Sequence, residues 1–281
     1  MHTKKNRSTK KKNTSTLKSY KSIKIISYNI SWESMSGSVK DWTLCSNNTN
    51  PNNPKHNSVC VNNIAQVFQQ DFLNSISKYN NNDIDFITLQ ESSDFKKLIE
   101  LSPQLKKMNY EAHNSSLDVI TTFWMPKYKL LHTIKGEFEK GRPWMATIFN
   151  NGNNGNNGKN IICLINVHFG HYKYNEEYRK MEKMLFTIKE EILIQKYIVN
   201  RFIISGDFNY NIKEFGNSNK NIIINGTKFY YNPKNILTCC IKRKKHYDHI
   251  IDSMAKPINI IIPKVKYMAS DHKPILGELV N

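Results

Sequence analysis

The 281-residue sequence lacks any apolar run of the roughly 18 to 20 residues that a membrane-spanning helix needs. It also lacks the short apolar segment near the N-terminus that marks a secretory signal. Hydrophobic residues make up 39% of the chain and charged residues 23%, which is typical of a globular protein. We therefore expect an intracellular protein, cytoplasmic or nuclear, with no transmembrane segment.

The five cysteines include no Cys-x-x-Cys pair, which argues against a structural zinc site. Without a secretory signal, reduced thiols are the default expectation. A pairing of Cys45 with Cys60 stays open. Cys239 and Cys240 are adjacent, and we predict that they do not pair with each other.

Acidic residues are absent from residues 1–24, where nine basic residues carry half of the net charge of +18. This composition predicts a basic, disordered tail over residues 1–23 and a single catalytic domain over 24–281. The tail suits non-specific binding to polyanions, an import signal or peripheral contact with an anionic membrane surface. A solvated leader without function is an equally good interpretation.

Short apolar runs alternate with polar loops along the rest of the chain. Helical spacing of apolar residues predicts helices over 61–79 and 176–199. A polar loop at 34–58 reads as an insertion or as a rim of the site. The runs that predict strands are 24–31, 85–92, 118–125, 127–134, 143–150, 160–169, 201–209, 235–240, 249–253 and 272–279. Many strands with few helices predict an α/β fold of two packed mixed sheets flanked by helices, a four-layer sandwich.

Residues with carboxylate, amide or imidazole side chains lie where these apolar runs begin or end. They are Asn29, Glu91, His168, Asp207 with Asn209, Asp248, and Asp271 with His272. If strand 201–209 continues to its end, Asp207 and Asn209 share one face. Side chains at neighbouring strand ends meet at one sheet edge, and oxygen ligands of this kind suit Mg²⁺. The pattern predicts a magnesium site, in which Mn²⁺ can substitute.

These motifs, in this order, resemble the endonuclease/exonuclease/phosphatase superfamily, which has the DNase I-like fold. The resemblance rests on SYNI, LQES, NVHF, GDFN, YDHI and SDHKP and covers roughly residues 24–279. Each motif alone is weak, but six in order beside strands are specific. The resemblance implies a divalent-metal-dependent phosphoester hydrolase in which water attacks phosphorus.

The resemblance also implies roles for the metal-binding residues. Glu91 would bind the metal, with Asn29 beside it in the ligand and hydrogen-bond network. Asp271 would support the metal or its water shell. Arg142, before strand 143–150, would bind a substrate phosphate, although a surface arginine at a turn is an equally plausible interpretation.

The catalytic roles follow from the same motifs. Asp207 would orient or deprotonate the attacking water, and Asn209 would hold that water or the phosphate. His272 would stabilise charge on the scissile phosphate, with Asp248 orienting its ring. His168 would assist the leaving group; a purely structural histidine is the alternative. We leave His113, His171 and His249 outside the site.

The basic charge favours nucleic acid as the substrate, because phosphate neutralisation drives such binding. The sequence therefore predicts a nuclease or phosphodiesterase acting on nucleic acid. Two alternatives stay open. One is a phosphatase or phosphodiesterase acting on phosphoinositide or sphingolipid head groups. The other is a catalytically silent binding module, which the complete set of site residues disfavours.

Overall fold

A computed structural model describes residues 22–30, 61–65, 67–68, 84–151, 160–171, 174–214, 220–234, 236–240, 245–256, 258–263 and 270–280. The expected basic tail, apart from its last residues, and the 34–58 loop lie outside the described residues, as do Cys45 and Cys60. Of the expected helix 61–79, residues 61–65 are helical and most of the remainder also lies outside.

The described strands form two mixed sheets of six and seven strands. The first has the order β12-β13-β1-β2-β4-β3, with β1 and β2 parallel. Its strands are β1 (Ile23–Asn29), β2 (Phe86–Gln90), β3 (Asn109–Asn114), β4 (Val119–Trp124), β12 (Ile258–Ile261) and β13 (Ile275–Leu279).

The second sheet has the order β5-β6-β7-β8-β11-β10-β9, with β7 and β8 parallel. Its strands are β5 (Tyr128–Glu139), β6 (Arg142–Asn151), β7 (Ile161–His168), β8 (Val199–Asp207), β9 (Asn221–Ile224), β10 (Thr227–Tyr230) and β11 (Asp248–Asp252). Central strands such as β7 are buried along their whole length, as expected for strands covered on both faces.

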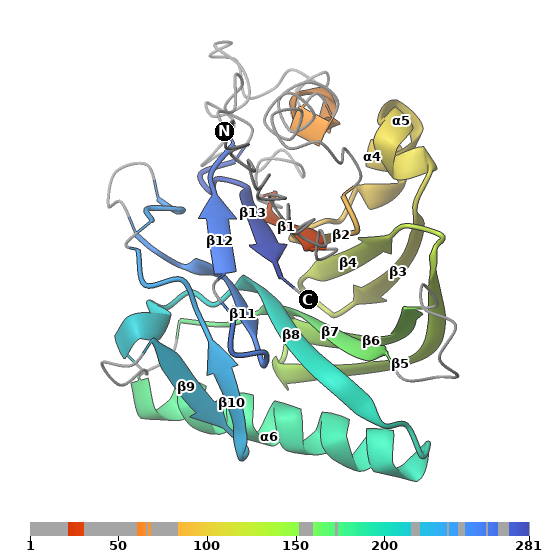
Figure 1. Ribbon diagram of the computed structural model, residues 1–281. Helices are drawn as coiled ribbons and strands as arrows, with labels where there is room; N and C mark the ends of the chain where they lie inside the picture. The colour runs from red at the N-terminus through yellow and green to blue at the C-terminus, as the bar shows by residue number, and fades with distance from the viewer. Residues whose placement is uncertain are drawn as a thin grey trace, which may run out of the picture.

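Helices cover the two outer faces (Figure 1). The amphipathic helix α6 (Tyr174–Ile194) packs on the second sheet through residues such as Met184 and Ile188. The short helices α4 (Phe95–Leu101) and α5 (Pro103–Lys106) pack on the first sheet. A third apolar cluster, including Phe86, Leu164 and Ile203, lies between the sheets. The fold is thus the predicted four-layer α/β sandwich.

Strand register brings the polar strand ends together. Asn29 pairs with Gln90 at the ends of the parallel strands β1 and β2, so Glu91 follows directly. His168 pairs with Asp207 at the ends of β7 and β8. On its other side β8 is antiparallel to β11, and there Asp207 pairs with Asp248. Within each sheet the pairing therefore places these polar residues side by side.

Some expectations about individual elements are wrong. Segment 235–240 is not a strand; within the described part it contributes one isolated bridge, Cys239 to Lys245. The described strands β3, β9, β10 and β12, and the helices α4 and α5, were not expected; the strands among them are short or exposed in part, so their sequences carry little periodicity.

None of the helices that can be described has the length and apolar character needed to span a bilayer.

The fold depends on Gly206, which precedes Asp207 on β8. A Cβ atom at Gly206 would lie 2.0 Å from the backbone oxygen of Val167 on the neighbouring strand. We expect Gly206→Ala to lower the free energy of unfolding by more than about 3 kcal/mol, because the parallel strands must separate. Urea denaturation followed by circular dichroism measures this loss.

Gly226→Ala is the matched control. Gly226 has φ +71°, but a Cβ there meets no atom within 4 Å. Its cost is therefore conformational only, about 1 kcal/mol. Equal losses for the two variants would show that the contact between β7 and β8 is not the constraint.

Candidate active site

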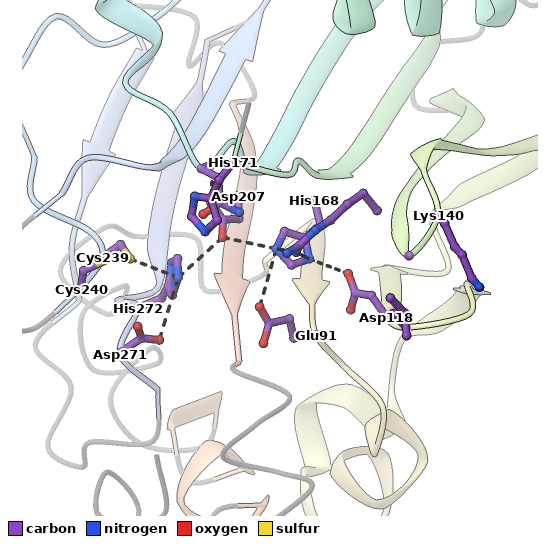
Figure 2. Close-up of a pocket in the computed structure, with 14 residues that line it drawn as sticks. Glu91, Asp118, Lys140, His168, His171, Asp207, Cys239, Cys240, Asp271 and His272 are labelled. Atoms are coloured by element: carbon purple, nitrogen blue, oxygen red, sulfur yellow. Dashed lines mark hydrogen bonds and ion pairs between the residues drawn. A yellow bond between two sulfur atoms is a disulfide. The ribbon is translucent and has the colours of Figure 1, made fainter. Parts of the chain in front are cut away.

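Asp207 lies at the centre of the polar cluster, buried at 1% exposure. Its Oδ1 accepts a hydrogen bond from the backbone N–H of Asn209 at 2.7 Å. Its Oδ2 lies 3.6 Å from Nε2 of His272 and 3.7 Å from Nε2 of His168. Figure 2 shows Asp207 between these two imidazoles, one from each side. The carboxylate of Asp207 thus faces two imidazole rings, each of which can carry a proton.

Asn29 connects Asp207 to Glu91 across the two sheets. Its Nδ2 donates to Oδ2 of Asp207 and to Oε1 of Glu91, each at 3.0 Å. Glu91 follows β2 in the left-handed conformation with φ 54°, which turns its carboxylate toward the pocket. The amide nitrogen of Asn29 therefore faces the carboxylates, so any metal ligation by this residue would use Oδ1.

His272 forms a buried pair with Asp248 at the start of β11. Nδ1 of His272 lies 2.9 Å from Oδ2 of Asp248, and the backbone N–H of Asp248 donates to Thr238 Oγ1 at 3.0 Å. Burial lowers the pKa of His272, but the carboxylates of Asp248 and Asp207 outweigh it and hold that pKa well above its usual value. His272 is therefore a cationic donor at neutral pH.

His168 has a carboxylate partner of its own. Its Nδ1 lies 2.5 Å from Oδ2 of Asp118, the residue before β4. Burial lowers the pKa of His168, while the hydrogen bond and charge of Asp118, with Glu91 and Asp207 nearby, raise it above the usual value. In the neutral ring, Nδ1–H donates to Asp118 and Nε2 accepts from Nη1 of Arg142 at 2.9 Å.

Asn209 and Asp271 reach the same pocket from loops. β8 ends at Asp207, so the expected shared strand face for Asn209 is not formed; Asn209 instead has φ 50°. Its Nδ2 donates to the backbone oxygen of Phe169 at 2.8 Å, which occupies the amide nitrogen. Asp271 has a side chain 38% exposed, and its Oδ1 lies 3.9 Å from Nε2 of His272.

These side chains line a pocket of about 420 Å³. Every expected site residue borders it except Asn29 and Asp248, which lie behind Glu91 and His272. The lining is Glu91, Leu117, Asp118, Lys140, Gly141, Arg142, His168, His171, Asp207, Asn209, Cys239, Cys240, Asp271 and His272. Arg142 lines this pocket, and its Nη1 lies 2.9 Å from Nε2 of His168.

The donor set fits a hard divalent cation on the side of Glu91. Glu91 and Asp207 both accept a hydrogen bond from the amide of Asn29, and both carboxylates line the pocket. Carboxylate oxygens beside an open pocket suit Mg²⁺, which keeps water and phosphate in its shell. Asp207, Asp248 and His272 also have donor atoms within 4.8 Å of one another. Nδ1 of His272 is engaged with Asp248, and Nε2 faces Asp207.

Sequence reasoning missed several pocket residues. Asp118 could have been predicted from the sequence, because it stands at the start of an apolar strand, as Asp248 does. His171 lines the pocket, contrary to expectation. His113 and His249 do not line it; His249 is buried and bonds backbone oxygens. Lys140 lies in the turn between β5 and β6, next to Arg142. The sequence does not indicate where this turn lies relative to the pocket.

The prediction that Cys239 and Cys240 do not pair is wrong. They form a disulfide between adjacent residues, with the Cα atoms 3.7 Å apart. Cys240 has φ 65°, in the left-handed region, and this backbone conformation brings the two side chains to the same side. Adjacent residues of an ordinary extended strand point to opposite sides, which is why the sequence argued against the pair.

No family model matches the sequence. An uncharacterized protein of Acanthamoeba polyphaga mimivirus is 29% identical over 227 residues, which cover 74% of this chain and 43% of the viral protein. The chain thus corresponds to less than half the length of that relative. An endonuclease/exonuclease/phosphatase structure from Bacteroides vulgatus aligns over 93% of this chain and 100% of its own, with a TM-score of 0.62 and 15% identity.

This chain has the endonuclease/exonuclease/phosphatase (DNase I-like) fold. The structure of ANGEL2, a 2′,3′-cyclic phosphatase, is also similar, with a TM-score of 0.58, 14% identity and coverage of 92% of this chain and 94% of that one. At these identities the likeness establishes the fold. The endonuclease/exonuclease/phosphatase fold predicted from the six sequence motifs is therefore confirmed.

The Asp118–His168 pair makes a titration prediction. In Asp118→Asn, burial still lowers the pKa of His168 while its main opposing charge is gone, so this pKa should fall from its raised value. A pH titration of the His168 ring signals by NMR measures the fall. Glu111→Gln, at an exposed carboxylate paired with Lys135, is the control.

The same pair makes stability depend on pH. A folded-state pKa above the unfolded value gives stability that is fully present below the unfolded pKa and lost as pH rises through the folded pKa. Asp118→Asn should therefore destabilise the chain more at about pH 5.5 than at about pH 8.5. An unchanged His168 pKa in this variant would contradict the assigned pair.

Proposed function

We propose that this chain is a divalent-metal-dependent phosphoester hydrolase that cleaves nucleic acid by attack of water on phosphorus. The observation that carries the proposal is the position of Asp207 between two histidines, each backed by its own carboxylate. This arrangement provides one acceptor for a proton of water and two donors for a phosphoryl group. The fold supports phosphoester hydrolysis as well, because similar structures include an endonuclease/exonuclease/phosphatase and a 2′,3′-cyclic phosphatase.

Asp207 is the group that orients the attacking water and takes its proton. Its Oδ1 is held by the Asn209 backbone N–H, and its Oδ2 by Asn29. Both bonds fix the carboxylate, so the direction of its remaining lone pairs is set before substrate arrives. Asn209 contributes here through its backbone, while its side-chain oxygen is left to contact the water or the phosphate.

His272 and His168 serve as the donors. His272 is held cationic by Asp248 and Asp207, so it stabilises negative charge that develops on the phosphoryl oxygens. The pKa of His168 lies above its usual value because the hydrogen bond and charge of Asp118, with Glu91 and Asp207, outweigh its burial, and the protonated ring would donate to the leaving oxygen or to the phosphate. Arg142, 2.9 Å from His168, adds a planar guanidinium suited to a phosphate.

Glu91 and Asp207, with Asp271 at the pocket edge, would hold the metal. When bound, Mg²⁺ or Mn²⁺ would supply positive charge that polarises the phosphoester and balances the acidic side of the pocket. Asn29 holds the two carboxylates together through its amide. The net charge of +18 favours a polyanionic substrate, which supports nucleic acid over a small neutral ester.

A cleavage assay tests this proposal. Labelled single-stranded, duplex and abasic DNA, and RNA, are incubated with Mg²⁺, Mn²⁺ or a chelator. We expect metal-dependent cleavage that falls at least about 100-fold in His272→Ala and in Asp207→Asn, because each removes a proton donor or acceptor from the reaction. His132→Ala is the control, since His132 pairs with Glu191 away from the pocket.

The outcomes separate the alternatives. Release of phosphate or head groups from phosphoinositide or sphingolipid substrates, without strand cleavage, would replace nucleic acid by a lipid or inositol phosphoester. Absence of hydrolysis on all substrates, with nucleic-acid binding kept in Asp207→Asn, would overturn the proposal in favour of a binding module.

A further inference from the structure

The Cys239–Cys240 disulfide lies in the pocket wall, where the proposed reaction assigns it no role. Its backbone is fixed on two sides. Cys239 exchanges backbone hydrogen bonds of 2.9 Å with Lys245, and the N–H of Cys240 donates to the backbone oxygen of Asp271 at 2.9 Å. The sulfur pair is therefore attached directly to the segment that carries Asp271 and His272.

Four potential donor groups converge at this wall. The sulfurs of Cys239 and Cys240 and a carboxylate oxygen of Asp271 lie within 4.8 Å of one another. Nε2 of His272 is 3.2 Å from Sγ of Cys239 and 3.9 Å from Oδ1 of Asp271. Figure 2 shows this group on one side of Asp207, while Glu91 and Asp118 lie on the other side.

Two sulfurs, one nitrogen and one carboxylate form a different donor set from the oxygen-rich side of the pocket. Thiolate sulfur is a soft ligand that selects Zn²⁺ and similar ions over Mg²⁺. In a disulfide neither sulfur carries the negative charge that metal ligation uses. The same residues therefore present no thiolate ligand when oxidised, and two thiolates beside Asp271 and His272 when reduced.

We propose that reduction of the Cys239–Cys240 disulfide creates a binding site for a thiophilic divalent cation of the Zn²⁺ class, with Cys239, Cys240, Asp271 and His272 as its ligands. A phosphine reductant breaks the S–S bond and supplies two electrons. Water gives its oxygen to the phosphine, which becomes a phosphine oxide, and its two protons to the sulfurs. Metal binding then releases both thiol protons to solvent.

The site would compete with the proposed hydrolysis, and this consequence rests on the proposed function. The same Nε2 of His272 that faces Asp207 at 3.6 Å would be a ligand of the bound ion. A ring engaged in this way cannot donate a proton to a phosphoryl group. Zn²⁺ should therefore inhibit the reduced chain and leave the oxidised chain unaffected at the same concentration.

Cobalt spectroscopy on the full chain tests the site without any substrate. The chain is reduced with a water-soluble phosphine and titrated with Co²⁺, whose thiolate complexes have a characteristic charge-transfer absorption. We expect this absorption to saturate at one ion per chain and to disappear when Zn²⁺ displaces cobalt. It should be absent in the disulfide form and in Cys239→Ser/Cys240→Ser.

The other three cysteines require a matched control. In Cys45→Ser/Cys60→Ser/Cys163→Ala the signal should persist, because only the pocket pair remains. Asp271→Asn should keep the absorption but weaken cobalt binding roughly tenfold or more. Cysteine alkylation followed by mass spectrometry verifies that Cys239 and Cys240 are thiols in the reduced sample.

Three results would overturn the proposal: a disulfide that the folded chain does not allow to be reduced, verified thiols without a cobalt–thiolate absorption, or an absorption that survives in Cys239→Ser/Cys240→Ser. Each is read without hydrolysis. A failure of the proposed hydrolase activity therefore stays distinguishable from a failure of the metal site.

Discussion

The candidate site depends on one side chain, the amide of Asn29, which holds together two carboxylates from opposite sheets. Glu91 follows the first sheet and Asp207 ends a strand of the second, and Asn29 donates to both at 3.0 Å. Beside this contact, Thr88 and Ser205 join the inner faces of the sheets through a buried hydroxyl pair at 2.8 Å. The hydrogen bonds of Asn29 and the Thr88–Ser205 pair thus connect the two sheets at the site, so the polar groups of the site also contribute to the packing of the sandwich.

Bringing two carboxylates together has an electrostatic cost, and the surrounding residues offset it. His272 and His168 each face Asp207, and each has a further carboxylate behind it, Asp248 or Asp118. Positive and negative groups therefore alternate across the pocket, which raises the pKa of both rings despite their burial. The same carboxylates therefore favour a positive charge on the ring at each side of Asp207.

The sequence allowed the sandwich and most of the cluster to be predicted because parallel strands place their carboxyl ends at one edge. Runs such as FITLQ before Glu91 and FIISG before Asp207 are rich in apolar residues and end at or next to the functional residue, so the strand end and the site coincide. Asn209 departs from this rule, because it lies beyond the strand in a left-handed conformation. The Cys239–Cys240 pair had no local signal, since its geometry is set by backbone contacts to Lys245 and Asp271. Tertiary contacts of this kind leave no trace in periodicity.

The two proposed metal sites would lie on opposite sides of His272. Oxygen donors from Glu91 and Asp207 lie on one side, and the sulfurs of Cys239 and Cys240 lie on the other. Softness of the ligands, rather than overall affinity, decides which ion each side prefers. Because Nε2 of His272 faces both Asp207 and Cys239, a metal ion on the sulfur side would remove a donor that the proposed hydrolysis uses. The oxidation state of Cys239 and Cys240 would then decide whether the pocket can bind a soft cation in addition to a hard one.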